Sequence, residues 1–72
     1  MYTLTMHGHT FVGNTLPALR HAVEAFRDRE DLTMHDWPKN PAVMFDGSVL
    51  GYMSYNGRVW KTQGHPSIEV VF

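Results

Sequence analysis

The sequence contains no cysteine, and only 18% of its 72 residues are charged. Without cysteine, disulfide bonds and thiolate metal ligands are excluded, although both support many small secreted domains. The formal net charge is −1, so the chain lacks the basic excess of a general nucleic-acid-binding domain. No apolar run is long enough to cross a membrane, and residues 1–12 alternate between polar and apolar types, unlike a signal peptide. We therefore expect a cytoplasmic protein.

The apolar residues that are present make up 43% of the chain, which is enough for one small core. Folded domains rarely have fewer than about 50 residues, so two domains would not fit. No internal repeat, low-complexity tract or linker-like change of composition interrupts the sequence. We interpret residues 1–72 as a single domain.

The first residues predict a β-hairpin. Apolar and polar side chains alternate over residues 2–6, which is typical of a strand with one buried face. Gly8-His9 suits a two-residue turn, because glycine adopts a positive φ without a steric penalty. This turn would pair Met6 with Phe11 and place both on the apolar face.

An amphipathic helix is predicted over about residues 16–28. Asn14 or Thr15 can cap it, and Pro17 would lie in the first turn, where its missing N–H is not needed. The apolar positions recur at helical spacing. They are Leu16, Leu19, Val23 and Phe26.

The remainder predicts a short extended piece at residues 32–34, a loop, and an antiparallel meander over residues 42–63. Asp46-Gly47 and Asn56-Gly57 are strong signals for two-residue hairpin turns. An apolar strand over residues 68–72 would end the chain. The predicted fold class is α+β, a mainly antiparallel sheet of three to five strands packed on one helix.

The two meander turns fix which side chains share a face of the sheet. One face would carry Val43, Phe45, Leu50, Tyr52 and Val59. The other would carry Met44, Val49, Met53, Tyr55 and Trp60. Both faces are apolar, but one helix can cover only one of them. Either the second face is exposed for a partner, or the segment around Trp37 and Pro38 covers it, or a bulge changes the register.

Acidic residues gather at the end of the predicted helix, where they oppose the helix dipole by about 0.3–1 kcal/mol each. They are Glu24, Asp28, Glu30 and Asp31. One interpretation is a solvated helix end, at which Arg27 and Arg29 offset part of the negative charge. The other is a charged rim that steers a basic partner surface.

Five histidines invite a metal-binding interpretation. His7 and His9 flank a glycine, but a stable zinc site takes three or four ligands. Only a chance approach of His35-Asp36 and His65 would complete such a site. We expect neither a metal nor a cofactor.

Catalytic patterns are equally weak, so we expect no enzyme. Ser48, Ser54 and Ser67 do not lie in a nucleophile-elbow motif, and no glycine-rich loop opens a helix. A basic and aromatic set (Arg58, Trp60 and Lys61) is typical of single-strand binders. So few cations neutralise little phosphate, and nucleic-acid binding remains only an alternative.

The order of a strand, one helix from Thr15 to Asp28 and a meander over residues 42–63 resembles that of small phage-encoded inhibitor proteins such as anti-CRISPRs. The resemblance covers the layout of most of the chain and involves no specific motif. It implies a viral protein that blocks a macromolecular surface.

We therefore predict a non-enzymatic protein–protein interaction module that acts as a steric inhibitor. The expected apolar anchors are Met44, Met53, Tyr55 and Trp60. The expected polar rim is Arg58, Glu30 and Asp31. The alternatives are a homodimer through the apolar face or residues 68–72, and a single-stranded nucleic-acid-binding module.

Overall fold

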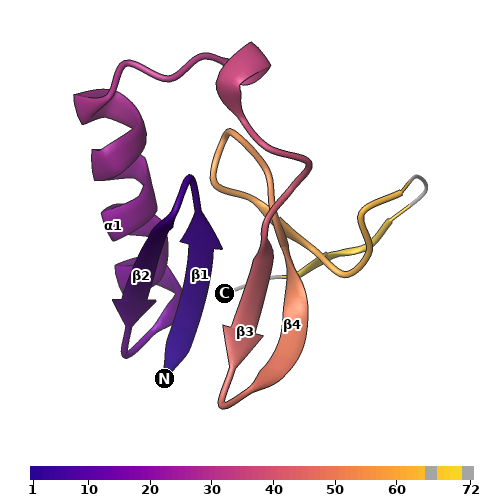
Figure 1. Cartoon of the computed structure of the whole chain (residues 1–72). Helices are drawn as coiled ribbons and strands as arrows, with labels where there is room; N and C mark the ends of the chain where they lie inside the picture. Colours follow the sequence, from indigo (N-terminus) through magenta and orange to yellow (C-terminus); the bar gives the residue numbers. More distant parts are fainter. Residues whose placement is uncertain (65–66, 71–72) are drawn as a thin grey trace.

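The computed structural model describes residues 1–64 and 67–70, and its fold is α+β (Figure 1). Helix α1 (Leu16–Arg29) packs on one six-stranded antiparallel sheet. The strands are β1 (Tyr2–Met6), β2 (His9–Gly13), β3 (Ala42–Phe45), β4 (Ser48–Met53), β5 (Val59–Trp60) and β6 (Glu69–Val70). Their order in the sheet is β2-β1-β3-β4-β5-β6. The predicted class is confirmed, but the predicted three to five strands are too few, because β1 pairs with β3 and joins the first hairpin to the meander.

The turn of the first hairpin lies one residue earlier than predicted. His7 and Gly8 have φ angles of 52° and 76°, the left-handed pair that a type I′ turn requires. Met6 therefore pairs with His9, and Leu4 pairs with Phe11. The observed register is shifted by two residues from the predicted one. Because side chains alternate between faces with a period of two, Met6 and Phe11 still share a face.

Helix α1 begins where its capping residues predict. The Thr15 side chain accepts a hydrogen bond from the Ala18 N–H at 3.1 Å, and Pro17 lies in the first turn. At the other end Asp31 adopts a φ of 54°, and the Leu32 N–H donates to the Arg27 carbonyl at 2.9 Å. This is a Schellman-type ending, in which an aspartate occupies the left-handed position that glycine usually fills.

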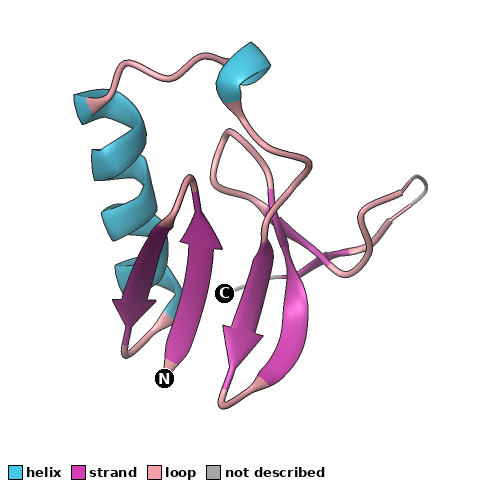
Figure 2. Ribbon diagram, in the orientation of Figure 1, coloured by secondary structure: helices cyan, strands magenta, loops and turns pink. Residues whose placement is uncertain are grey.

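Of the extended piece predicted at residues 32–34, Thr33 is extended, with φ −101° and ψ 175°. The prediction is wrong for Met34, because Met34–Asp36 forms a short 3₁₀ turn, η1, between α1 and β3 (Figure 2). The Asp36 carboxylate accepts hydrogen bonds from the Thr33 N–H at 3.0 Å and the Thr33 hydroxyl at 3.1 Å. These bonds hold the pKa of Asp36 below its usual range. The local capping box outweighs the extended preference of the segment.

The pairing of β3 with β4 follows the predicted register next to the turn and then shifts by one residue. Asp46 and Gly47 form the turn with φ angles of 50° and 88°, and Met44 pairs with Val49. Beyond this pair a bulge leaves Leu50 without a partner, so Val43 pairs with Gly51. A Cβ atom at Gly51 would lie 2.7 Å from the Trp60 carbonyl oxygen, so the close approach of β5 requires glycine here.

The β4–β5 turn holds three residues, 55–57, and the predicted two-residue turn is wrong. The Gly57 N–H donates to the Ser54 carbonyl at 2.9 Å, and the Ser54 N–H donates to the Arg58 carbonyl at 2.8 Å. Gly57 alone in this turn has a positive φ, of 85°, which is typical of a type I turn closed by a glycine bulge. Met53 consequently pairs with Val59, and Tyr52 pairs with Trp60.

The core lies on one side of the sheet, which we call the inner face. Its buried members are Leu4, Met6, Leu16, Leu19, Val23, Phe26, Val43, Met53 and Val59. Trp37 packs against this same core, and its indole N–H donates to the Met53 carbonyl at 3.2 Å. The segment around Trp37 thus extends the cover that α1 provides. Of the predicted last strand, 69–70 is β6, and 71–72 lie outside the described residues.

Candidate functional site

The side of the sheet opposite the core is a second, solvent-facing surface, which we call the outer face. Successive side chains of a strand point to opposite sides, and directly paired residues share a side. Leu4, Val43 and Val59 point into the core, so the residues that alternate with them point outward. The outer face comprises Thr3, Thr5, Thr10, Val12, Met44, Val49, Tyr52 and Trp60.

Apolar side chains on the outer face are open to solvent. Val12 and Val49 are each 53% exposed, and Met44, Tyr52 and Trp60 are half-buried. Figure 1 shows α1 alongside β2 and β1, and the core contacts of α1 place it on the inner face. No helix in residues 1–64 and 67–70 covers the outer face. Met44 pairs with Val49 and Tyr52 pairs with Trp60, whereas Thr3 separates Val12 from Met44. Exposed apolar groups gathered on one face are typical of interaction sites.

Two of the four predicted anchors, Met44 and Trp60, lie on the outer face. Met53 does not, because it is 0% exposed and belongs to the core. The prediction for Met53 is wrong because the bulge at Leu50 shifts the register of β4 by one residue. The residues of β4 after the bulge therefore point to the opposite face from the one predicted. Tyr52 takes the place on the outer face that the sequence assigned to Met53.

Tyr55, the remaining predicted anchor, connects three parts of the chain. Its hydroxyl donates to the Leu32 carbonyl at 3.0 Å, and its ring meets that of Trp37 edge-on, with 5.6 Å between centroids. The Arg27 guanidinium lies 5.1 Å from the same ring and donates to the Tyr55 carbonyl at 2.8 Å. Tyr55 therefore fixes the β4–β5 turn to the end of α1.

The predicted polar rim is divided between the two faces. Arg58 is exposed and directly precedes β5, and Trp60 pairs with Glu69, so charged residues of both signs lie near Trp60 in the chain and in the sheet. Glu30 and Asp31 lie at the end of α1, on the inner side, where the Glu30 carboxylate accepts from Arg29 at 3.4 Å. The acidic helix end is therefore not part of the outer face.

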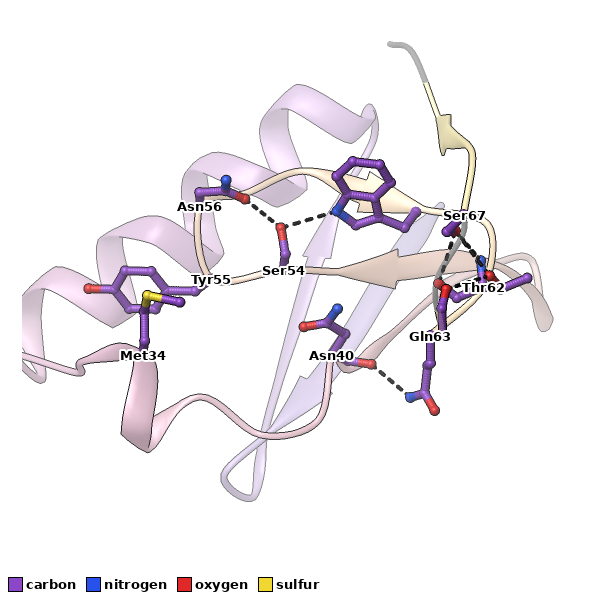
Figure 3. A pocket seen from close by; sticks show the side chains of 10 residues that line it. Met34, Asn40, Ser54, Tyr55, Asn56, Thr62, Gln63 and Ser67 are labelled. Carbon is purple, nitrogen blue, oxygen red and sulfur yellow. Dashed lines mark hydrogen bonds between the residues drawn. The ribbon is translucent and has the colours of Figure 1, made fainter.

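A cleft of about 250 Å³ opens at the Trp60 end of the outer face, and we call it the Trp60 cleft. Figure 3 shows Met34 and Tyr55 at one end of it and Gln63 and Ser67 at the other. Its described lining residues are Met34, Asn40, Ser54, Tyr55, Asn56, Trp60, Thr62, Gln63, Gly64 and Ser67. The sequence pattern pointed to Trp60 and Tyr55 but not to the hydroxyl and amide residues around them.

Hydrogen bonds hold the polar walls of the Trp60 cleft in place. The Trp60 indole N–H donates to the Ser54 hydroxyl at 3.4 Å, and that hydroxyl donates to the Asn56 side-chain oxygen at 2.5 Å. Across the cleft, the Gln63 amide donates to the Asn40 carbonyl at 3.0 Å. None of the described lining residues carries an acidic, basic or thiol side chain. The lining suits an uncharged, partly apolar group better than acid–base chemistry.

The histidines take separate places in the fold. The His7 ring nitrogen Nε2 is 3.0 Å from the Asp36 carbonyl, while the His9 ring packs 4.9 Å from that of Phe26. Within residues 1–64 and 67–70 no three metal-binding side chains cluster, and His65 lies outside the described residues. In the same part of the chain, no helix has both the length and the apolar character needed to cross a membrane.

No protein-family model matches the chain, and neither a curated protein nor a solved structure matches it. The surface must therefore be interpreted from its own geometry. The outer face and the Trp60 cleft share Trp60, whose ring lies at the border between them. Such a surface can bury apolar area against another macromolecule, with hydrogen-bonding groups at one end.

Proposed function

We propose that the protein is a non-enzymatic protein-binding module whose outer face docks on an apolar patch of a folded partner. The observation that carries the proposal is the solvent exposure of Val12 and Val49, at 53% each, on a face that no described helix covers. Aromatic residues and methionine, which are enriched at interfaces, complete the patch with Tyr52, Trp60 and Met44.

The chemistry of the surface indicates the kind of partner. Threonines lie among the apolar residues on β1 and β2, where Thr3 separates Val12 from Met44. Glu69 pairs with Trp60, which lies two residues after Arg58. Since these charges are of opposite sign, we propose a partner patch that is largely uncharged. An aliphatic or aromatic side chain of the partner would enter the Trp60 cleft. Docking of this kind would inhibit by occluding the partner's surface, as the resemblance to phage inhibitors implies.

Nucleic-acid binding is a weaker alternative for a geometric reason. Lys61 lies beyond the end of β5, in a bend of the chain. The register places Glu69 beside Trp60, where a carboxylate would repel a phosphate backbone. The basic and aromatic residues of this hairpin therefore do not form one cationic stacking surface.

A matched pair of lysine substitutions tests the proposal. Val49→Lys adds a charge to the outer face, whereas His21→Lys adds one to an exposed position of α1. A protein captured from cell lysate by the immobilised chain is identified, purified and titrated calorimetrically against each variant. We expect Val49→Lys to weaken binding by about tenfold or more and His21→Lys to leave it unchanged. Equal affinities for both variants would contradict the proposal.

A further inference from the structure

Strand β2 forms one end of the sheet in the described part of the chain, and α1 packs against it. In the described part of the chain β2 pairs with β1, and no strand lies on its other side. Natural sheets protect such edges with lysine, proline, inward-pointing charges or bulges. Residues 9–13 have none of these, and their pairing with β1 is regular. By contrast, the described part of β6 at the other end of the sheet is two residues long and includes Glu69.

The register determines which main-chain groups this edge presents. In a hairpin with a two-residue turn, the residues that flank the turn form a hydrogen-bonded pair, here Met6 and His9. Bonded and non-bonded pairs alternate along an antiparallel ladder. Thr10 and Val12 fall in the non-bonded pairs, so their N–H and C=O groups point away from β1. The edge therefore offers two donors and two acceptors to another strand.

We propose that β2 pairs in an antiparallel manner with β2 of a second copy of this chain. The two-fold axis that relates the copies would lie midway between their two Phe11 residues. Thr10 of one copy then faces Val12 of the other, and the two pairs exchange four main-chain hydrogen bonds. Both are β-branched residues, which favour cross-strand contact. His9 faces Gly13, so no like charges oppose each other. This self-complementarity favours a second copy over an unrelated strand.

The position of α1 is compatible with this pairing. Leu19 approaches Gly13, and the Phe26 ring lies 5.1 Å from that of Phe11, so these residues cover the inner side of β2. Successive residues of a helix are 100° apart around its axis, so the surface of α1 next to Leu19 and Phe26 carries three alanines. They are Ala18, Ala22 and Ala25. Small side chains allow two helices to approach at the short end of the usual 8–10 Å range.

The dimer would join two six-stranded sheets into one continuous sheet. The two outer faces would then adjoin along Thr10 and Val12. A partner with repeated binding patches would be bound bivalently, which raises the effective concentration of the second contact. The pairing itself does not depend on the proposed function, because it uses main-chain groups of the β2 edge.

The test compares two lysine substitutions that differ only in the strand they occupy. The hydroxyls of Thr5 and Thr10 hydrogen-bond to each other at 3.0 Å, so Thr5→Lys and Thr10→Lys remove the same bond and add the same charge. Sedimentation over a wide concentration range should show wild type and Thr5→Lys rising from 8.3 kDa towards twice that mass. Thr10→Lys should dimerise at least tenfold more weakly. A wild type that stays monomeric, or equal dimerisation of both variants, would overturn the proposal.

A second measurement on the wild type needs no substitution. Hydrogen exchange of the Thr10 and Val12 amides should slow as the protein concentration rises, while the Phe11 amide, already paired with β1, changes less. If the mass rises but the exchange of Thr10 and Val12 does not change with concentration, the copies associate through another surface and the proposal fails.

Discussion

Replacing Met53 with alanine tests the register that separates the core from the outer face. In the predicted register Met53 is an exposed anchor, so its loss would weaken partner binding and leave the fold intact. In the structure its side chain is fully buried beside Val59, and Trp37 donates to its carbonyl group. The substitution should therefore reduce the free energy of unfolding.

The size of the effect follows from the atoms removed. Methionine loses three heavy atoms beyond Cβ, and about 0.8 kcal/mol for each buried methylene equivalent gives roughly 2.5 kcal/mol. The incompletely filled cavity adds to this, and buried methionine-to-alanine changes cost about 2–5 kcal/mol. We expect about 3 kcal/mol for Met53→Ala, a large part of the stability of a chain this small.

Met34→Ala is the matched control, because Met34 is 73% exposed. Urea unfolding followed by circular dichroism measures the midpoint and slope for both variants. The urea midpoint of Met53→Ala should fall steeply. The free energy of unfolding of Met34→Ala should differ from that of the wild type by less than about 0.5 kcal/mol. Similar small losses in the two variants would refute the assignment of Met53 to the core.

Three further substitutions test local contacts. Asp31→Gly should stabilise the protein by about 0.5–1 kcal/mol in urea unfolding, because glycine adopts the φ of 54° without a Cβ clash; an unchanged midpoint would contradict the left-handed helix ending. Tyr55→Phe should cost about 1 kcal/mol in the same assay through loss of the bond to the Leu32 carbonyl, and no loss would show that this bond is not formed. The bonds from Thr33 lower the pKa of Asp36, so its stabilisation is complete above the ordinary pKa of aspartate and is lost as the pH falls through the lower folded value. NMR titration should find the carboxyl of Asp36 protonating below its usual range, and Asp36→Asn should remove this acid-dependent contribution; a normal titration would contradict the capping box.

Local signals predicted α1 and the Asp46-Gly47 turn well. The Thr15 cap, the early proline and the apolar spacing all lie within a few residues of the helix they define. The turn needs two adjacent residues with positive φ, and its sequence supplies them. Features of this kind depend on neighbours in the chain, so the sequence alone is sufficient.

The register of β4 and β5 depended on two features that the turn signals did not reveal. Gly51 is a glycine inside a strand, which can indicate a bulge, and its close approach to the Trp60 carbonyl is visible only in the fold. The three-residue turn then moved the pairing by one more residue. The two changes cancel for Trp60, which remains on the face of Met44, but not for Met53. The candidate site was therefore predicted in part.

Chemical-shift mapping of the labelled protein with its purified partner tests directly whether the outer face is the protein-binding surface. We expect the shifts induced at saturation to concentrate on the outer face, at Val49, Tyr52 and the Trp60 indole N–H. The exposed positions of α1, such as His21 and Ala25, should show little change. Shifts centred on α1, with Val49 and Trp60 unaffected, would contradict the assignment of the outer face as the protein-binding surface.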